Sequence, residues 1–340
     1  MFALDVPVGW HMVIAQVQAT TDKTSLSAGP VAIVSEAKPT PNDIAGDSLT
    51  LEGFMKHEGF DVVKLRRQNL GNQKPHRDNP KHLIIDVGVN RVSASLMVDT
   101  GTPTTNIARA SLEKFGVVEQ KTSDRITSPL GSASNNFFGI ATLATLAVGN
   151  CVITNVPILI DVIPFLDGVL GSEEMRKVGA VLDCAHAAVY VLPQGPSGEA
   201  SHKLATMLQR NGFTQVPMRL TSDHRLEVSC SIDGIASTII VDTGSAATCV
   251  NKNIGIKAGV MMKHTRKALT GSGETSAPML IGRVKQFAIG DFEIRDADVG
   301  FIDLNKSDQP FVSLLGIGEL ISNSAIIDLG SLSMYLRHRR

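Results

Sequence analysis

The chain has 340 residues, 43% of them apolar, and a formal charge of −1 at pH 7. This length and composition are typical of a globular protein with two lobes of about 140 residues each. The near-neutral charge argues against a nucleic-acid-binding protein, which usually has a basic face, and no apolar run is long enough to span a membrane.

The first 50 residues precede the repeated part of the chain. Residues 12–19 end like a signal-peptide cleavage site, but the first basic residue is Lys23 and Asp5 interrupts the apolar run, so a secretory signal has little support and the localisation stays open. A Pro/Gly/Ser-rich joint at 193–198 separates two similar halves. We predict these boundaries: an N-terminal extension at 1–50, a first lobe at 51–194, a linker at 195–203 and a second lobe at 204–340.

Each half contains alternating apolar residues that lead to the tripeptide Asp-Thr-Gly. The period of two indicates strands with one buried face. The polar pairs Asn90-Arg91 and Asp233-Gly234 interrupt the two runs, and the second pair is typical of a two-residue hairpin turn. Short apolar runs broken by turn residues predict a mainly β protein, with short helices only at 108–115, 172–178 and 317–322.

Further landmarks follow each Asp-Thr-Gly in the same order and at nearly equal distances. They are a glycine turn, an apolar-apolar-Gly triplet, an aspartate after a short apolar run, and a tyrosine. This self-similarity predicts an internal duplication. The matched positions are Gly149 and Gly290, 169–171 and 314–316, Asp183 and Asp328, and Tyr190 and Tyr335.

The repeated pattern resembles the aspartic peptidases of the retropepsin and pepsin type, with both lobes fused in one chain. The resemblance covers roughly residues 51–337, and its most specific part is the coupling of each Asp-Thr-Gly to its own apolar-apolar-Gly. It implies a mainly β, bilobed acid-protease fold, made of two homologous retropepsin-like β-barrel lobes with a few short helices. It also implies that Asp99 and Asp242 are the catalytic pair.

Two carboxylates that face each other cannot both ionise easily, so they share a proton. Such a pair can act as general base and general acid on one water molecule, which is the chemistry of peptide hydrolysis without a cofactor. The assignment of the two roles belongs to the pair and is left open by the sequence.

The residues that follow each aspartate are predicted to hold the pair in place. Gly101 and Gly244 allow a sharp turn and a close approach of two backbones. Thr100 and Thr243 can exchange hydroxyl-to-backbone hydrogen bonds across the two loops, a grip that the family resemblance also implies.

Thr102 and Ser245 stand three positions after the two aspartates. We expect each hydroxyl to donate to the outer carboxylate oxygen and so to favour the ionised form. The alternative is ordinary turn chemistry, since Ser and Thr are common in loops.

Glycine- and serine-rich hairpin tips follow each catalytic loop. They could close over a bound peptide as flaps, or they could be plain surface turns. A flap from each lobe is typical of the retropepsin-like arrangement, and the tyrosine of a pepsin-like flap is missing here. The residues concerned are Leu130, Gly131 and Ser132 in the first repeat and Gly271, Ser272 and Gly273 in the second.

Other catalytic chemistries find no support in the sequence. The histidines lack metal-ligand spacing, and Ser245 is not part of a Gly-x-Ser-x-Gly motif. Asp183 and Asp328 could be metal ligands, but a duplicated structural turn explains them better, so we expect no metal. The four cysteines, two per lobe, allow one disulfide in each lobe, although buried free thiols fit their unmatched positions better.

We therefore predict an aspartic endopeptidase that acts on a peptide or protein substrate and is active as a monomer, because one chain carries both aspartates. The alternative is a catalytically silent module that binds an extended peptide by β-strand addition. Intact Asp-Thr-Gly in both repeats favours the enzyme, since a binding module has no need for two acids that repel each other.

Overall fold

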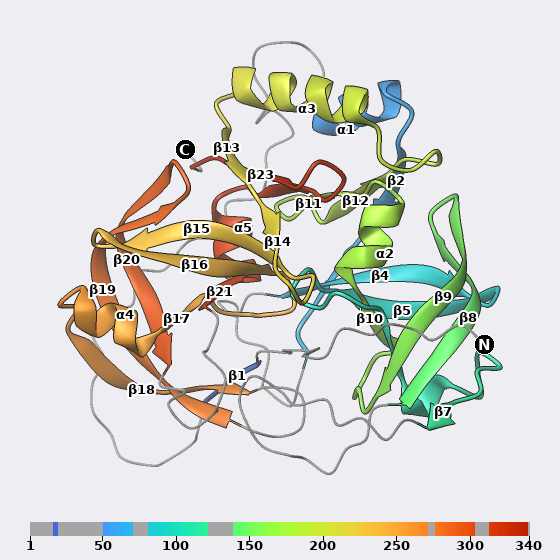
Figure 1. The fold of residues 1–340 in the computed structure, drawn as a ribbon, viewed down its shortest axis with the longest axis horizontal. Coiled ribbons are helices and arrows are strands. Elements are labelled where there is room, and N and C mark those ends of the chain that lie inside the picture. The colour runs from blue at the N-terminus through green and yellow to red at the C-terminus, as the bar shows by residue number, and fades with distance from the viewer. Residues whose placement is uncertain are drawn as a thin grey trace.

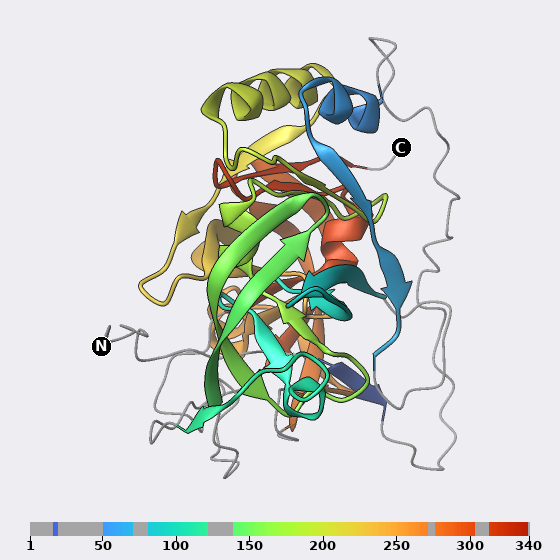
Figure 2. The same ribbon diagram turned by 90° about the vertical axis from the view of Figure 1, so that its right-hand side faces the viewer.

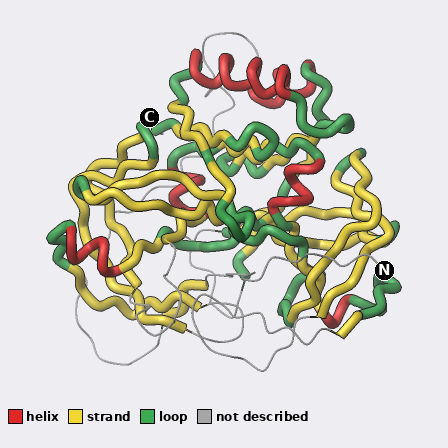
Figure 3. The backbone as a smooth tube through the Cα atoms, viewed as in Figure 1, coloured by secondary structure: helices red, strands yellow, loops and turns green. Residues whose placement is uncertain are grey.

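The computed structural model describes residues 16–19, 50–70, 81–121, 139–270, 276–302 and 313–338. Two β-barrels lie side by side, the first on the right of Figure 1 and the second on the left, and a further sheet and two helices lie above them. Strands dominate the chain and the helices are short, as the tube in Figure 3 shows. The prediction of a mainly β, two-lobed fold is therefore confirmed.

The first barrel is closed by six strands. Its hydrogen-bonded order is β4, β5, β10, β6, β9, β8 and back to β4, where Gly88 pairs with Ala147. Strands β3 (Arg66–Gln68) and β7 (Gln120–Lys121) extend it outside the ring. The ring strands are β4 (His82–Val89), β5 (Val92–Val98), β6 (Asn106–Ala108), β8 (Gly139–Val148), β9 (Cys151–Asp161) and β10 (Gly168–Leu170).

The second barrel repeats the first strand for strand. Its order is β15, β16, β21, β17, β20, β19 and back to β15, where Ser231 pairs with Ala288. The shared order confirms the predicted duplication. The ring strands are β15 (Leu226–Ile232), β16 (Ile235–Asp242), β17 (Cys249–Asn251), β19 (Ser276–Ile289), β20 (Phe292–Ile302) and β21 (Ser313–Gly316), and the outer strands are β1 (Gln16–Ala19), β14 (Arg219–Leu220) and β18 (Met262–Thr270).

The alternating residues form the predicted hairpins. Along β15 every second side chain is buried in the barrel core, which removes its apolar surface from water. Both hairpins turn through residues with positive φ, at 47° and 69° for Asn90 and Arg91 and at 44° and 84° for Asp233 and Gly234. Such turns match the right-handed twist of the strands, so they fix the register of each hairpin. The aspartate at the end of the second strand is thereby held in a fixed position.

A six-stranded sheet joins the two halves. At its centre β11 (Val181–Asp183) and β22 (Ile326–Asp328) pair antiparallel, with Leu182 opposite Ile327. The first half adds β12 (Ala188–Val191) and β2 (Asp61–Lys64), and the second half adds β23 (Ser333–Leu336) and β13 (Thr214–Pro217). Each half thus contributes three strands to this interlobe sheet, which fixes the position of one barrel relative to the other.

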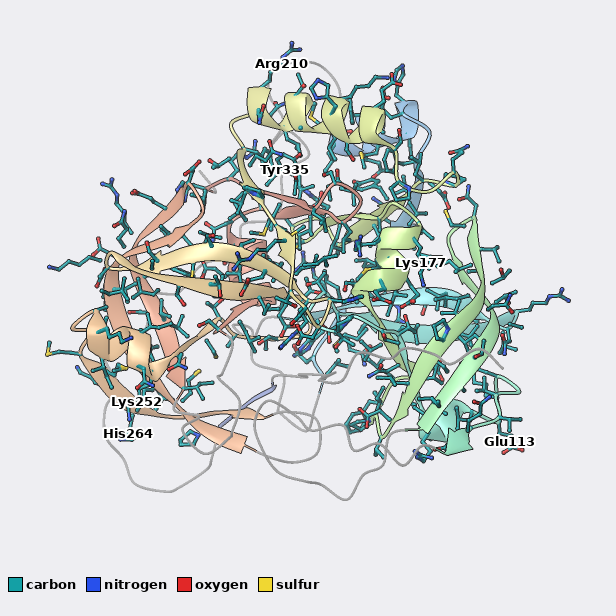
Figure 4. The ribbon with its side chains drawn as sticks, viewed as in Figure 1. Glu113, Lys177, Arg210, Lys252, His264 and Tyr335 are labelled. Carbon is teal, nitrogen blue, oxygen red and sulfur yellow. The ribbon has the colours of Figure 1, made fainter. Side chains whose placement is uncertain are left out.

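Two helices cover the interlobe sheet. Helices α1 (Leu51–His57) and α3 (Gly198–Arg210) lie together at one end of the molecule in Figure 2. Their apolar faces pack on one buried cluster that contains both matched tyrosines, Tyr190 and Tyr335, and Figure 4 shows Tyr335 beneath α3. The tyrosines are therefore core residues of the sheet.

The helices match the predictions only in part. Helices α2 (Ser172–Lys177) and α5 (Ile317–Ser322) lie where they were predicted, directly after each apolar-apolar-Gly. The helix predicted at 108–115 is a single 3₁₀ turn, Arg109–Ser111, followed by irregular turns. Helix α3 begins inside the segment predicted as a linker, because the hydroxyl of Ser197 caps it and its apolar face has the sheet to pack on. Helix α4 (Lys252–Lys257) was not predicted.

Candidate active site

The two Asp-Thr-Gly loops meet where the barrels face each other. Asp99 directly follows β5, and Asp242 is the last residue of β16. The hydroxyl of Thr100 accepts a hydrogen bond from the backbone N–H of Thr243 at 3.1 Å and donates one to the carbonyl of Val241 at 2.7 Å. The hydroxyl of Thr243 makes the mirror-image pair, with the N–H of Thr100 at 3.0 Å and the carbonyl of Val98 at 2.8 Å. The predicted grip is present, and both threonines are fully buried.

The glycines of the two loops are needed for their close approach. A Cβ atom on Gly101 would lie 2.5 Å from Cγ of Asp242, and a Cβ on Gly244 would collide with the carboxyl group of Asp99 in the same way. Each carboxyl group therefore packs directly over the backbone of the opposite loop. This arrangement brings the two acids together and agrees with the predicted reason for a glycine at both positions.

The apolar-apolar-Gly strands support the loops from beneath. Strand β10 lies parallel to β5, and the N–H of Asp99 donates to the carbonyl of Leu170 at 3.1 Å. In the second half β21 lies parallel to β16, with Asp242 opposite Gly316. The N–H groups of Ser172 and Ile317, at the starts of α2 and α5, donate to the catalytic loops.

The two carboxyl groups differ in their hydrogen bonds. Asp99 accepts from the Thr102 hydroxyl and from the N–H of Gly101, both at 2.8 Å. Asp242 accepts from the N–H of Ser245 at 2.9 Å, but the Ser245 hydroxyl donates to the carbonyl of Ala247 instead. The structure thus brings Thr102 to the position predicted for it, whereas the prediction for the Ser245 hydroxyl is wrong.

The pKa values of the two carboxyl groups are shifted to different extents. Burial raises the pKa of Asp99, but hydrogen bonds from Thr102, from Gly101 and from Asp242 itself pull that pKa back down. Burial and the nearby charge of Asp99 raise the pKa of Asp242 well above its usual range. Among the described residues no donor points at Oδ2 of Asp242, which fits an oxygen that carries the shared proton. These opposite influences make Asp99 the more acidic member of the pair in direction.

Sequence reasoning missed a buried glutamate that braces the first loop. Oε2 of Glu174, on α2, accepts from both the N–H and the hydroxyl of Thr105, at 3.0 and 2.7 Å. The equivalent residue in the second half, Glu319, accepts instead from the side chain of Asn323. The signal was available in the matched positions of the two glutamates behind their apolar-apolar-Gly triplets.

A buried histidine in the first barrel was also missed. His82 begins β4 of the first barrel, is only 3% exposed, and neither ring nitrogen makes a hydrogen bond of good geometry among the described residues. A single histidine in a strand gives no sequence signal for such burial.

The predicted flap residues 130–132 and 271–273 lie outside the described part of the chain. The strands that flank them form antiparallel hairpins, with Lys121 opposite Gly139 and Thr270 opposite Ser276. The flap assignment stays a prediction.

Asp183 and Asp328 have the structural role expected of them. Asp183 accepts from the N–H of His186 at 2.9 Å, and Asp328 accepts from the N–H groups of Gly330 and Ser331. Within the described ranges no group of three or more His, Cys, Asp or Glu side chains could hold a metal ion. All four cysteines are buried free thiols, and no helix in the part of the chain seen here is long and apolar enough to cross a membrane.

Part of the second half is similar to a known protein family. Residues 228–318, which contain the second Asp-Thr-Gly and its supporting strand, match the family model "Aspartyl protease". A search of curated protein sequences finds no significant match.

Two solved structures are similar to this chain. The aspartic proteinase from Irpex lacteus aligns with a TM-score of 0.46 and 15% identity, over 82% of this chain and 97% of that one. A retropepsin-like aspartic protease from Rickettsia conorii aligns with a TM-score of 0.30 and 20% identity, over 39% of this chain and 89% of that one. The family match lies in the second half, and the two barrels of identical strand order and the interlocked Asp-Thr-Gly loops agree with it: the chain is similar to bilobed, retropepsin-like aspartic peptidases.

Proposed function

We propose that the protein is an aspartic endopeptidase whose catalytic residues are Asp99 and Asp242. The observation that carries this proposal is the cross-lobe grip, in which each threonine of the Asp-Thr-Gly loops bonds the backbone of the opposite loop. This rigid contact holds two acids together despite their repulsion. A strained arrangement of this kind is retained where its shared proton is used.

The asymmetry of the pair suggests the role of each acid. Asp99, the more acidic member, acts as the general base that takes a proton from the attacking water. Asp242, which holds the shared proton, donates it to the oxygen of the scissile carbonyl as the tetrahedral intermediate forms. When the C–N bond then breaks, the proton that Asp99 received passes to the leaving nitrogen, and Asp242 takes back a proton from the hydroxyl that becomes the new carbonyl, so both acids return to their starting forms. No cofactor enters this sequence.

The substrate in this proposal is a peptide or protein segment that binds in an extended form across the two loops, under the hairpins that flank 130–132 and 271–273. Since one chain supplies both aspartates, the monomer is the active form. The non-catalytic alternative, a peptide-binding module, gives no account of why a fully buried pair of carboxyl groups is kept at the centre of the molecule.

The proposal is tested by Asp99→Asn and Asp242→Asn in cleavage assays with a peptide library, with and without a statine-type inhibitor. Each change preserves the volume and removes one acid function, so each should abolish turnover while the far-UV spectrum stays native. The matched control is Asp86→Asn, an exposed aspartate on β4.

Turnover in either dyad variant at more than about a hundredth of the wild-type rate would refute the assignment. Specific activity should also stay constant on dilution to low nanomolar concentration. A collapse on dilution would show that the active pair forms between two chains.

A further inference from the structure

One side chain of the second half contacts the helix behind the first catalytic loop. His224 lies in the turn between β14 and β15, and Glu173 lies in the first turn of α2. Nδ1 of His224 and Oε1 of Glu173 are 2.7 Å apart, which is a hydrogen-bond distance. In Figure 1 the turn after β14 reaches toward the first barrel. The contact therefore joins the two halves outside the interlobe sheet and outside the Asp-Thr-Gly loops.

The turn that presents His224 is closed on itself. The N–H groups of Thr221 and Arg225 donate to the Arg225 carbonyl and the Thr221 hydroxyl, both at 2.9 Å. The N–H of His224 donates to the Thr221 carbonyl at 3.0 Å, and Arg225 forms an ion pair with Asp223. His224 itself has a φ of 63°, which a glycine would adopt at lower cost. A histidine in this conformation, on a fixed turn, indicates a role for its ring.

The other end of the contact leads to Asp99. The N–H of Glu173 donates to the carbonyl of Pro103 at 2.9 Å, and the N–H of Ser172 donates to the carbonyl of Thr102 at 2.9 Å. The hydroxyl of Thr102 in turn donates to Oδ2 of Asp99 at 2.8 Å. A shift at the start of α2 would therefore move the hydroxyl that stabilises the ionised Asp99.

The matching positions of the other pair of elements do not repeat this contact. Gly318 follows its apolar-apolar-Gly triplet as Glu173 follows the first one, and it has no side chain to accept a hydrogen bond. Lys81 stands as far before Asp99 as His224 stands before Asp242. The bond between the halves is therefore made once at these positions, and it serves the loop of Asp99.

We propose that the hydrogen bond between His224 and Glu173 makes both of them positioning residues, which keep the start of α2, and through it the Thr102 hydroxyl, in register with the Asp99 carboxyl. This inference rests on the proposed peptidase function and adds to it two residues outside the Asp-Thr-Gly motifs. Because they act through residues 102–103, they should affect the rate of turnover more than the binding of substrate.

The exposure of the contact makes this local effect measurable. The side chains of His224 and Glu173 are 45% and 22% exposed. Polar contacts that are open to solvent contribute little to global stability. The interlobe sheet and the hydrogen bonds between the two threonines hold the halves together without it. Substitutions at either residue should therefore leave the protein folded.

The experiment is a double-mutant cycle of His224→Ala and Glu173→Ala, which separates the bond from the effects of each side chain alone. His224→Asn keeps an N–H donor near the place of Nδ1 and tolerates a positive φ. The controls are His202→Ala and Glu199→Ala, exposed residues of α3. The readouts are kcat and KM at pH 5.5, and hydrogen exchange of the amides of residues 172 and 173.

We expect each alanine variant to lower kcat by about three- to tenfold, the size of one hydrogen bond in a rate constant, with KM changed less than about twofold. Exchange at 172 and 173 should speed up by a similar factor. The double variant should be no worse than either single variant, because both remove the same bond. His224→Asn should stay within about twofold of the wild type in both readouts.

Effects of the two alanine variants that multiply in the double variant would overturn the proposal, since the residues would then act independently. A change in KM with kcat unaltered would overturn it as well. Exchange needs no activity, so it separates this inference from the peptidase function: unchanged exchange at 172 and 173 refutes the contact even in an active peptidase. If the wild type cleaves no peptide, non-additive exchange effects still support the contact and additive ones refute it. If His224→Ala fails to fold, Glu173→Ala and His224→Asn carry the same test.

Discussion

The grip between the two loops can be tested by removing one hydroxyl. In Thr100→Val the side chain keeps its shape, but the N–H of Thr243 and the carbonyl of Val241 lose their partner in a fully buried place. A buried polar group without a partner costs about 1–3 kcal/mol. With two such groups, the expected loss is about 2–6 kcal/mol in the free energy of unfolding. Thr100→Ser keeps the hydroxyl and loses one methyl group, for about 1 kcal/mol.

The measurement is urea unfolding followed by circular dichroism at pH 7. The same Thr→Val change at Thr142, on the exposed face of β8, serves as the control and should cost little. The double variant Thr100→Val/Thr243→Val should depart from the sum of the single losses, because each hydroxyl bonds the backbone of the other threonine and the two belong to one hydrogen-bond network. A Thr100→Val variant no less stable than Thr100→Ser would refute the reasoning.

Three further predictions concern the pair and its surroundings. Thr102→Ala should move the acid limb of the pH profile of kcat/KM up by about one unit, because it removes a hydrogen bond from the ionised Asp99. Ser245→Ala should leave the limb in place, because its hydroxyl bonds the carbonyl of Ala247. Equal shifts in the two variants would contradict the geometry. Gly101→Ala should abolish peptide cleavage, since its methyl group would occupy the space of the opposing carboxyl; activity above a tenth of wild type would argue against that contact. Burial raises the pKa of Asp161 to about 6, so its protonated form stabilises the fold below its usual pKa and this contribution is lost as the pH rises through 6. Asp161→Asn should accordingly raise the free energy of unfolding more at pH 7.5 than at pH 4, by up to about 3 kcal/mol, and an equal effect at both pH values would count against it.

Much of the fold and the site could be predicted because the information is local and appears twice. Alternating apolar residues define the strands, Asp233-Gly234 defines a tight turn, and the repeated Asp-Thr-Gly with its apolar-apolar-Gly shows which strands lie together. The hydrogen bonds between the two threonines could be predicted from the same duplication, because the two copies of the loop face each other and carry the same residues.

The misses have physical causes of a different kind. The Ser245 hydroxyl can donate to the Asp242 carboxylate or to the carbonyl of Ala247, and it donates to the Ala247 carbonyl. The sequence does not show which acceptor is used. Helix α3 forms because the interlobe sheet offers its apolar face a surface, which composition alone does not reveal. The contact of His224 with Glu173 exists only once the barrels are docked, so no pattern within one repeat could indicate it.

The interlobe sheet also bears on how such a molecule could have evolved. Its centre is an antiparallel pair of like strands, β11 and β22, so each half offers the other the kind of edge that two identical subunits share across a twofold axis. In an ancestor made of two copies, every residue would have had to serve in both places at once. A single chain with two unlike halves is free of that requirement. Thr102 and Ser245 accordingly differ in the acceptors of their hydroxyls, so that the two carboxyl groups have unequal surroundings.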